Sequence, residues 1–163
     1  MSSVEINIVK FFNDRKQDTI NFYNFISLCC TIITTGVLLL IFDRSKFFII
    51  LFILTLLLVL LLKTTIKRER PYKKCCKIHN NDITPTNENY SFPSLHVAGT
   101  TVLCLMLWER YNMPHFFIML IPLCIISRMG LGVHYLSDCL GGFFIATFIY
   151  LFMKLEYKKN VLS

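Results

Sequence analysis

Three short polar blocks in a largely apolar chain carry side chains that together suit the binding of a phosphate and the cleavage of its ester bond. The blocks are KTTIKRERP at residues 63–71, PSLH at residues 93–96 and SRMGLGVHYLSD at residues 127–138. Each block lies at the end of a long apolar run. They supply two histidines, a carboxylate and at least three permanent cations, and phosphoryl transfer depends on positioning and charge stabilisation by such groups.

The third block combines a histidine with a carboxylate and an arginine. His134 and Asp138 are four residues apart, so on a helix they share one face. A carboxylate beside an imidazole fixes its tautomer, and histidine serves as a nucleophile or as a base. Arg128 is suited to hold a phosphate in a bidentate grip. Taken alone, the His–Asp pair also fits a structural hydrogen bond at the end of a helix.

The second block has the residues of a helix start. Pro93 suits a first helical turn, and Ser91 or Ser94 is a suitable cap. Free N–H groups at a helix N-terminus bind phosphate, and His96 would lie within one turn of such an anion. An ordinary capped helix with a hydrogen-bonded histidine explains the same block when it is considered alone.

The first block places Lys63 and Arg70 seven residues apart, with Pro71 restricting the backbone that follows. The surrounding segment is strongly basic. By itself, this block also fits a cytoplasmic anchor beside a transmembrane helix.

The composition indicates an all-α membrane protein. Of the 163 residues, 55% are hydrophobic, and they come in runs of the kind that cross a bilayer as helices. We expect a polytopic bundle of about five transmembrane helices. The runs lie at about residues 21–42, 47–62, 95–108, 116–133 and 139–153.

The expected organisation is one membrane domain with two flanking segments. Residues 21–153 form the domain, preceded by a tail or interfacial amphipathic helix at 1–20 and followed by a basic tail at 154–163. The longest polar stretch, at about 67–92, contains two prolines and is expected to be a loop. Short links elsewhere favour antiparallel neighbouring helices.

Counting the helices predicts where the polar blocks meet. If the run at 47–62 ends on one face of the membrane, the next run begins on that same face at PSLH. Two further crossings return the chain to this face at Ser127, and the last run starts there between His134 and Asp138. All three blocks are therefore expected at one end of the bundle.

The formal net charge of +7 suggests an anionic partner. The apolar runs argue against a nucleic acid, whereas anionic lipid headgroups or a phosphorylated substrate fit a membrane protein better. Cys75, Cys76 and His79 lie close together in sequence, but their spacing is not that of a standard zinc site and a fourth ligand is missing. We interpret them as loop residues. The sequence does not indicate an oligomeric state.

These blocks resemble the motifs of the type 2 phosphatidic acid phosphatase superfamily, which read K-x6-RP, then PSGH, then SR-x5-H-x3-D. The resemblance spans about residues 50–153 and implies an acid-phosphatase-like helical core. The matching residues are Lys63, Arg70 and Pro71 in the first motif, Pro93, Ser94 and His96 in the second, and Ser127, Arg128, His134 and Asp138 in the third.

The second motif departs from the family pattern because Leu95 occupies the position of the glycine. If that glycine mainly presents a backbone N–H to the phosphate, Leu95 presents one equally well. If it leaves room beside the leaving group, Leu95 narrows the pocket. We therefore expect activity to be retained and the choice of substrate to change.

The resemblance implies a role for each matched residue. His134 would attack phosphorus and form a phosphohistidine, Asp138 would orient it, and His96 would protonate the leaving oxygen. The residues implied to bind the phosphate are Lys63, Arg70, Ser94, Leu95 through its backbone, and Arg128. The cations take the place of metal ions, so neither a metal nor another cofactor is implied.

The sequence thus predicts an integral membrane phosphatase that hydrolyses a lipid phosphate or diphosphate, such as phosphatidic acid or a polyprenyl diphosphate. A lipid phosphotransferase with the same His–Asp pair and a non-catalytic lipid-binding membrane protein are the alternatives. Counting Lys and Arg would place the site on the cytoplasmic face, because the positive-inside rule applies to such flanks. The resemblance implies the extracytoplasmic or lumenal face, which we favour because three of these cations are needed for phosphate.

Overall fold

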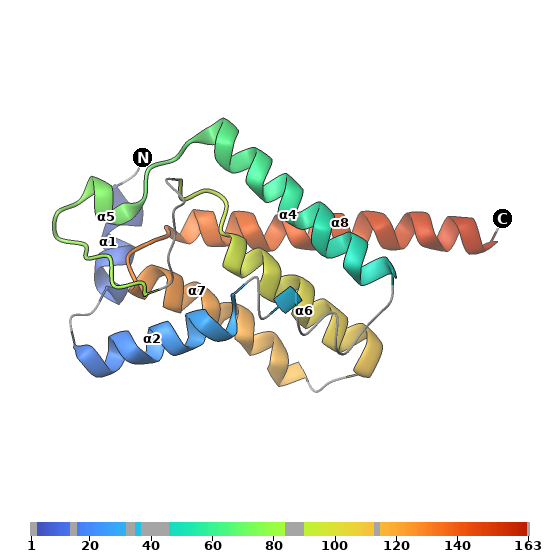
Figure 1. The fold of residues 1–163 in the computed structure, drawn as a ribbon, viewed down its shortest axis with the longest axis horizontal. Coiled ribbons are helices and arrows are strands. Elements are labelled where there is room, and N and C mark those ends of the chain that lie inside the picture. Colours follow the sequence, from blue (N-terminus) through green and yellow to red (C-terminus); the bar gives the residue numbers. More distant parts are fainter. Residues whose placement is uncertain are drawn as a thin grey trace.

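The computed structural model describes residues 3–13, 16–31, 35–36, 46–83, 90–112 and 115–162. In these ranges the regular structure is helical, apart from an isolated antiparallel bridge between Glu69 and Tyr90, so the predicted all-α class is confirmed. The elements, shown in Figure 1, are α1 (Ser3–Phe12), α2 (Gln17–Cys29), α4 (Lys46–Ile66), α5 (Pro71–Lys74), α6 (Leu95–Tyr111), the 3-10 helix η1 (His115–Met119), α7 (Leu120–Gly130) and α8 (Leu136–Leu162).

Helices α4, α6 and α8 pack against one another. On the other side of the bundle, α7 packs against both α6 and α2 (Figure 1). The chain enters and leaves these helices at opposite ends of the bundle. The turns that precede α6 and α8 therefore lie at the same end as α1 and α5, as Figure 1 shows.

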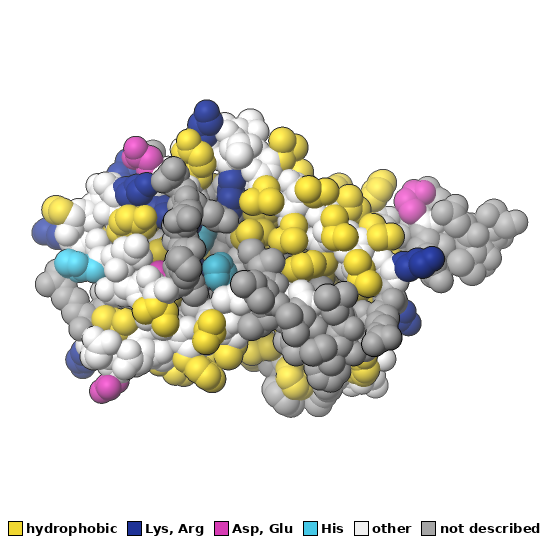
Figure 2. Space-filling model, viewed as in Figure 1, with side chains coloured by type: hydrophobic (Ala, Val, Ile, Leu, Met, Phe, Trp, Pro, Cys, Tyr) yellow, Lys and Arg dark blue, Asp and Glu magenta, His cyan; other side chains and the backbone are white. Residues whose placement is uncertain are grey.

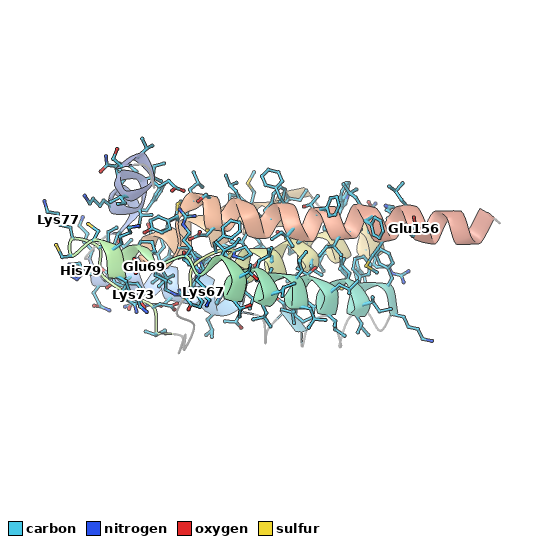
Figure 3. The ribbon with its side chains drawn as sticks, turned by 90° about the horizontal axis from the view of Figure 1, so that it is seen from above. Lys67, Glu69, Lys73, Lys77, His79 and Glu156 are labelled. Atoms are coloured by element: carbon cyan, nitrogen blue, oxygen red, sulfur yellow. The ribbon has the colours of Figure 1, made fainter. Side chains whose placement is uncertain are left out.

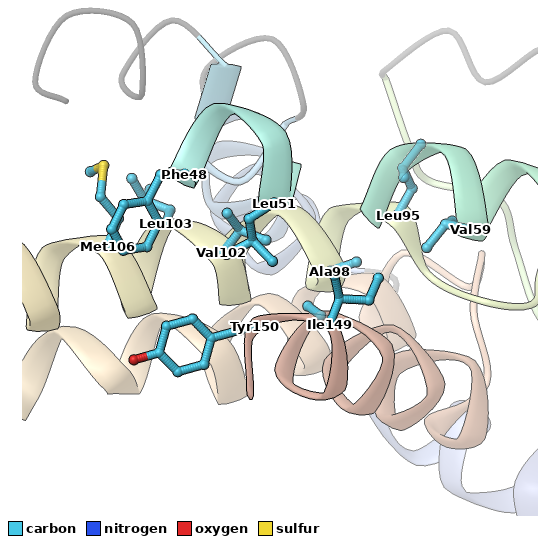
Figure 4. Close-up of a cluster of buried hydrophobic side chains, with 11 residues drawn as sticks. Phe48, Leu51, Val59, Leu95, Ala98, Val102, Leu103, Met106, Ile149 and Tyr150 are labelled. Atoms are coloured by element: carbon cyan, nitrogen blue, oxygen red, sulfur yellow. The ribbon is translucent and has the colours of Figure 1, made fainter. Parts of the chain in front are cut away.

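The main hydrophobic core lies between α4, α6 and α8. Figure 4 shows side chains from all three helices meeting there. The buried members are Phe48, Leu51 and Val59 of α4, Leu95, Ala98, Val102, Leu103 and Met106 of α6, and Ala146, Ile149 and Tyr150 of α8. Their spacing of mostly three or four residues places them on one face of each helix, which is why these apolar segments pair.

Two helices are long and apolar enough to cross a membrane by length and composition, namely α4 and residues Leu136–Glu156 of α8. Leucines such as Leu57 and Leu61 remain exposed on α4, and Figure 2 shows hydrophobic side chains gathered over that helix. Four of the five predicted runs coincide with α4, α6, η1 with α7, and α8. The run at 21–42 lies partly outside the described residues, so the number of spanning helices stays a prediction.

The predicted loop and the two flanking segments each contain helix, and for residues 1–20 a helix was one of the two predicted forms. The predicted loop at 67–92 contains α5, a single turn begun by Pro71, and its residues 84–89 lie outside the described part. Helix α8 continues through 154–162, which has no Gly or Pro to end it. Helix α1 forms within residues 1–20 and buries Val9. Figure 3 shows Lys67, Glu69, Lys73, Lys77 and His79 at one end of the molecule and Glu156 toward the other.

Candidate active site

Hydrogen bonds tie the three polar blocks together at the end of the bundle that carries α1 and α5, as the helix count predicted. The Ser91 N–H donates to the Arg68 carbonyl at 2.8 Å, which joins the first block to the segment before the second. The Ser94 N–H donates to the Asp138 carbonyl at 2.9 Å, which joins the second to the third. Residues far apart in sequence therefore form one continuous backbone framework.

Lys63 belongs to the core-facing side of α4 although it is charged. The buried residues of this helix are Phe48, Leu51, Thr55, Val59 and Lys63, a spacing of three or four that defines one face. Lys63 is the last of them, so its stem follows the core and its ammonium group reaches the polar end, where it donates to the Tyr90 carbonyl at 3.3 Å. Helical periodicity thus aims this cation into the site.

Arg70 is fully buried directly before α5. Its backbone is extended, and Pro71 occupies the first turn of α5, where a missing N–H has no cost. One guanidinium N–H donates to the Val133 carbonyl at 3.4 Å, next to His134. The proline therefore turns the chain so that Arg70 points inward beside the predicted nucleophile.

Helix α6 begins at Leu95, with Ser94 in the N-cap position. The predicted side-chain cap is wrong, because the Ser94 hydroxyl makes no capping bond and Pro93 precedes the helix rather than entering its first turn. The Ser94 backbone is instead held by Asp138 of α8. Its buried hydroxyl has no protein partner among the described residues and remains available beside the helix N-terminus.

The Leu95 side chain packs into the core rather than beside the Ser94 hydroxyl. It is 5% exposed and belongs to the same cluster as Val59 and Ala98 (Figure 4). Its backbone N–H still lies in the first turn of α6, where such groups bind anions. The Leu95 side chain therefore contributes to the packing of the core, and a glycine at this position would not.

We expect Leu95→Ala to lower the free energy of unfolding by about 2–4 kcal/mol, because truncating a buried leucine leaves a cavity. Denaturant unfolding of the protein in detergent measures this effect. Leu60→Ala is the matched control, since Leu60 is exposed on α4 and its loss should cost under about 0.5 kcal/mol. Equal losses for the two variants would contradict the packing seen for Leu95.

His134 and Asp138 meet at the start of α8. His134 lies just before the helix and is 2% exposed, and Asp138 is buried in its first turn. The His134 Nδ1 and the Asp138 Oδ2 are 3.7 Å apart, longer than a hydrogen bond. The same Oδ2 accepts the Tyr135 N–H at 2.8 Å. The two side chains are thus neighbours that are not hydrogen-bonded. Such distances between catalytic groups often shorten when substrate binds.

The surroundings of His134 favour a neutral imidazole. Burial lowers the pKa of His134 well below its usual value, and the positive charges of Arg70, Arg128 and Lys63 lower it further. A hydrogen bond to the Ser91 backbone opposes this shift. An unprotonated imidazole keeps the lone pair that a nucleophile requires. The same three cations act electrostatically on His96, so both histidines face one cluster of positive charge.

Arg128 is fully buried near the end of α7 and has two partners that the sequence did not reveal. One terminal N–H donates to the Ser27 hydroxyl of α2. Another forms an ion pair with the Asp82 carboxylate at 2.7 Å, and both side chains are fully buried. No motif or spacing points to Ser27 or Asp82, because they lie 101 and 46 residues from Arg128.

Polar atoms without a protein partner concentrate in these same residues. Among the described residues, six buried side-chain nitrogen or oxygen atoms lack a hydrogen-bond partner, and four of them belong to predicted site residues. These four are the Ser94 Oγ, His96 Nε2, Arg128 Nε and His134 Nδ1. Buried polar groups are otherwise nearly always paired, so this concentration is typical of a site that binds a polar ligand.

The described residues include no group of three His, Cys, Asp or Glu side chains that could hold a metal ion. The buried cations at this end of the bundle are Lys63, Arg70 and Arg128. Three fixed cations beside a neutral imidazole are able to bind a phosphate dianion and to stabilise the charge of its transition state.

Gly142 allows α8 to approach the start of α6. A Cβ at this position would lie 2.3 Å from the Ser94 carbonyl oxygen, which a side chain cannot tolerate. The glycine therefore permits the contact that holds Ser94 beside Asp138.

We expect Gly142→Ala to lower activity by about 10²-fold, because displacement by about 1 Å is enough to misplace reacting groups. Rates of phosphate release per folded protein measure the effect. Gly99→Ala is the matched control within α6, since its Cβ would meet its nearest atom at 3.6 Å, an ordinary contact. Similar rates for the two variants would show that this close approach is not needed.

Comparisons with known proteins agree with this arrangement. The sequence model of the PAP2 superfamily matches residues 46–161. Two curated relatives, the decaprenylphosphoryl-5-phosphoribose phosphatases of Mycobacterium tuberculosis and Mycolicibacterium smegmatis, are each 32% identical over 80 residues. The match covers 49% of this chain and 42% of each relative, so the chain spans less than half of their length.

The fold also resembles a solved structure, the first transmembrane PAP2-type phosphatidylglycerolphosphate phosphatase from Bacillus subtilis. The TM-score is 0.68 with 22% sequence identity, and the match covers 96% of this chain and 86% of that one. This likeness shows a common helical fold.

Proposed function

The chain belongs to the PAP2 superfamily, and from this premise we propose that it is an integral membrane phosphatase that hydrolyses a lipid phosphate or diphosphate. One observation carries the proposal: two histidines, a carboxylate and three buried cations from separate segments of the chain meet at one end of an apolar bundle. Ionisable groups that a membrane protein buries in this way are usually functional.

In the proposed first step, the neutral imidazole of His134 attacks phosphorus. The negative charge of the bound phosphate offsets the three cations and allows His96 to carry a proton. His96 donates this proton to the leaving oxygen as the bond from phosphorus to that oxygen breaks. The product is a phosphohistidine on His134 and a free lipid alcohol, or a lipid monophosphate when the substrate is a diphosphate. As the 3.7 Å between the His134 Nδ1 and the Asp138 Oδ2 shortens in the substrate complex, Asp138 accepts the Nδ1–H of His134 and stabilises its positive charge.

In the second step, water attacks the phosphohistidine. His96, now without its proton, takes a proton from the water, and inorganic phosphate leaves His134. Lys63, Arg70 and Arg128 hold the phosphoryl oxygens in both steps, while the Ser94 hydroxyl and the Leu95 N–H complete the cradle. The apolar faces of α4 and α8 give the lipid tail a route from the bilayer.

The names of the relatives support a phosphorylated lipid as substrate. One name specifies decaprenylphosphoryl-5-phosphoribose and the other phosphatidylglycerolphosphate. We assign a substrate of the same general class, a phosphorylated lipid, to this chain. The test below is designed to identify which lipid it is.

The test is a panel of lipid phosphates and diphosphates supplied in mixed micelles to the detergent-purified protein, with and without a metal chelator. We expect release of inorganic phosphate that the chelator does not affect, because the three cations supply the positive charge. A new phospholipid formed from an added alcohol would identify a phosphotransferase instead. Binding without turnover of any lipid in the panel would indicate a lipid-binding protein, and loss of activity with the chelator would contradict the cation-based scheme.

We also propose that the active site faces the extracytoplasmic or lumenal side. Cys76 is exposed in the loop at this end of the bundle, so its thiol reports which side that end occupies. A membrane-impermeant thiol reagent should label it in intact cells or in vesicles with that side outward, and Cys76→Ser identifies the labelled position. Labelling only after the membrane is opened would place the site on the cytoplasmic face.

A further inference from the structure

Arg68 contacts the His–Asp pair although it lies outside the residues that the motifs specify. One of its guanidinium N–H groups donates to the Asp138 Oδ1 at 2.6 Å, on the side of the carboxylate away from the Tyr135 N–H. The guanidinium also lies over the Tyr135 ring, with 4.3 Å from its central carbon to the ring centroid. Arg68 therefore helps to fix the orientation of the Asp138 carboxylate.

Helix α1 holds Arg68 from the other side. A second guanidinium nitrogen pairs with the Glu5 Oε2 at 2.7 Å, and the Ser137 hydroxyl donates to the other oxygen of Glu5. Arg68 also donates to the Ser137 hydroxyl at 2.6 Å. Glu5, Arg68 and Ser137 thus form a closed ring of polar contacts, and Arg68 links this ring to Asp138. The Glu5 and Arg68 side chains are each about one-fifth exposed.

The seating of α1 gives Glu5 a defined position. Val9, one turn after Glu5, is fully buried and packs with Ile78 and Tyr135. Beyond the helix, the Asn13 side-chain amide donates to the carbonyls of Gly130 and His79 at 2.9 and 3.1 Å. Gly130 and Tyr135 flank the turn that carries His134, so α1 is anchored over that turn.

We propose that Glu5 and Arg68 are positioning residues that set the orientation and the charge of Asp138 for the reaction of His134. The proposal rests on the proposed phosphatase function. Glu5 lies outside the residues 46–161 that match the PAP2 superfamily, so a segment outside the family match contributes to the catalytic machinery.

The physical reason is the balance of charge around Asp138. Within the described part of the chain, the ion pairs of Arg68 are with Glu5 and Asp138. With both carboxylates present, Arg68 is shared, and Asp138 keeps negative charge for His134. Without the Glu5 charge, Arg68 acts fully on Asp138, draws it from an imidazole that is already 3.7 Å away, and leaves more positive charge near His134.

Glu5→Gln tests this because it keeps the shape and the hydrogen-bond acceptor of the side chain while removing the charge. We expect kcat to fall by about 10-fold with KM changed by less than about 3-fold, since Asp138 acts on the reacting histidine rather than on phosphate binding. Arg68→Lys should have a similar effect because lysine lacks the fork that reaches both carboxylates. The double variant should then lose little more than either single variant.

The pH dependence of kcat/KM separates positioning from a merely structural role. The groups that face His134 from the packed elements are Lys63, Arg70, His96, Arg128 and Asp138, with Glu5 and Arg68 behind Asp138. Removing one negative charge makes protonation of His134 less favourable, so the acid limb should move to lower pH, by about half a unit. A variant that only loosened α1 would leave the limb in place.

Asp18→Asn is the matched control, because Asp18 is an exposed carboxylate in the first turn of α2 and its loss changes the net charge equally. Its kcat and acid limb should be those of the wild type. Glu5→Asp retains the charge on a shorter side chain and should recover at least part of the kcat and the wild-type pH profile.

Vanadate binding supplies a readout that does not require the natural lipid, because vanadate adopts the geometry of the phosphoryl transition state. Glu5→Gln should weaken vanadate binding by about 10-fold and leave inorganic phosphate binding within about 2-fold. Wild-type kcat, pH profile and vanadate affinity in Glu5→Gln would overturn the inference while the phosphatase function stands. A wild-type protein that neither releases phosphate nor binds vanadate would overturn both.

Discussion

We expect His134→Ala to lower the rate of phosphate release by about 10⁴-fold or more, because the variant loses the atom that attacks phosphorus. Burial and three nearby cations lower the pKa of His134, and no other described imidazole combines a neighbouring carboxylate with these charges. Rapid acid and alkali quenches of the wild type with a radiolabelled lipid phosphate should trap a phosphoenzyme that survives alkali and not acid. The variant should form none.

His79→Ala is the control for this experiment. His79 lies at the same end of the molecule as the site, as Figure 3 shows, but its side chain is exposed and only its backbone binds Asn13. Its loss should leave the rate unchanged. A purified His134→Ala variant with near-normal phosphate release would refute the role assigned to His134.

The second large effect concerns the buried ion pair of Arg128 and Asp82. Arg128→Ala should lower activity by about 10³-fold, the scale at which an arginine stabilises a phosphoryl transition state. It should also lower the free energy of unfolding by about 3–5 kcal/mol, because it leaves the Asp82 carboxylate buried without its partner. Phosphate release and denaturant unfolding measure the two effects separately.

The double variant Arg128→Ala/Asp82→Ala distinguishes stability from catalysis. Removing both members of a buried pair leaves no uncompensated charge, so much of the lost stability should return. Activity should stay low because the phosphate has lost a cation. Recovery of activity together with stability would show that Arg128 is only structural, and would remove it from the phosphate site.

Much of the fold follows from the sequence because the lipid bilayer restricts what an apolar segment is able to form. Four runs of apolar residues predicted the positions of α4, α6, α7 and α8, since only helices satisfy their own backbone in lipid. Alternation of helix direction then predicted that the three polar blocks meet at one end. Lys63 illustrates how closely local periodicity and site geometry agree, because it ends the core-facing stripe of α4.

Local pattern was a poorer guide where tertiary contacts compete with it. Ser94 has the sequence of a side-chain cap, yet its backbone is bound by Asp138 and its hydroxyl is left beside the helix N-terminus. Leu95 occupies a motif position, yet its side chain belongs to the core. For Ser94 the close approach of α6 and α8 decides the outcome, and Gly142 permits that approach. For Leu95 the packing of the core between α4, α6 and α8 decides it.

The residue types and spacing of the polar blocks were sufficient by themselves to predict that a His–Asp pair and several cations meet at one end of a helical bundle. They could not reveal that Asp82 and Ser27 hold Arg128, or that Glu5 reaches Arg68 across 63 residues. Spacing reports neighbours along one helix, whereas these contacts join segments that only packing brings together. The tertiary structure alone therefore determined which side chains surround the site and share its charge.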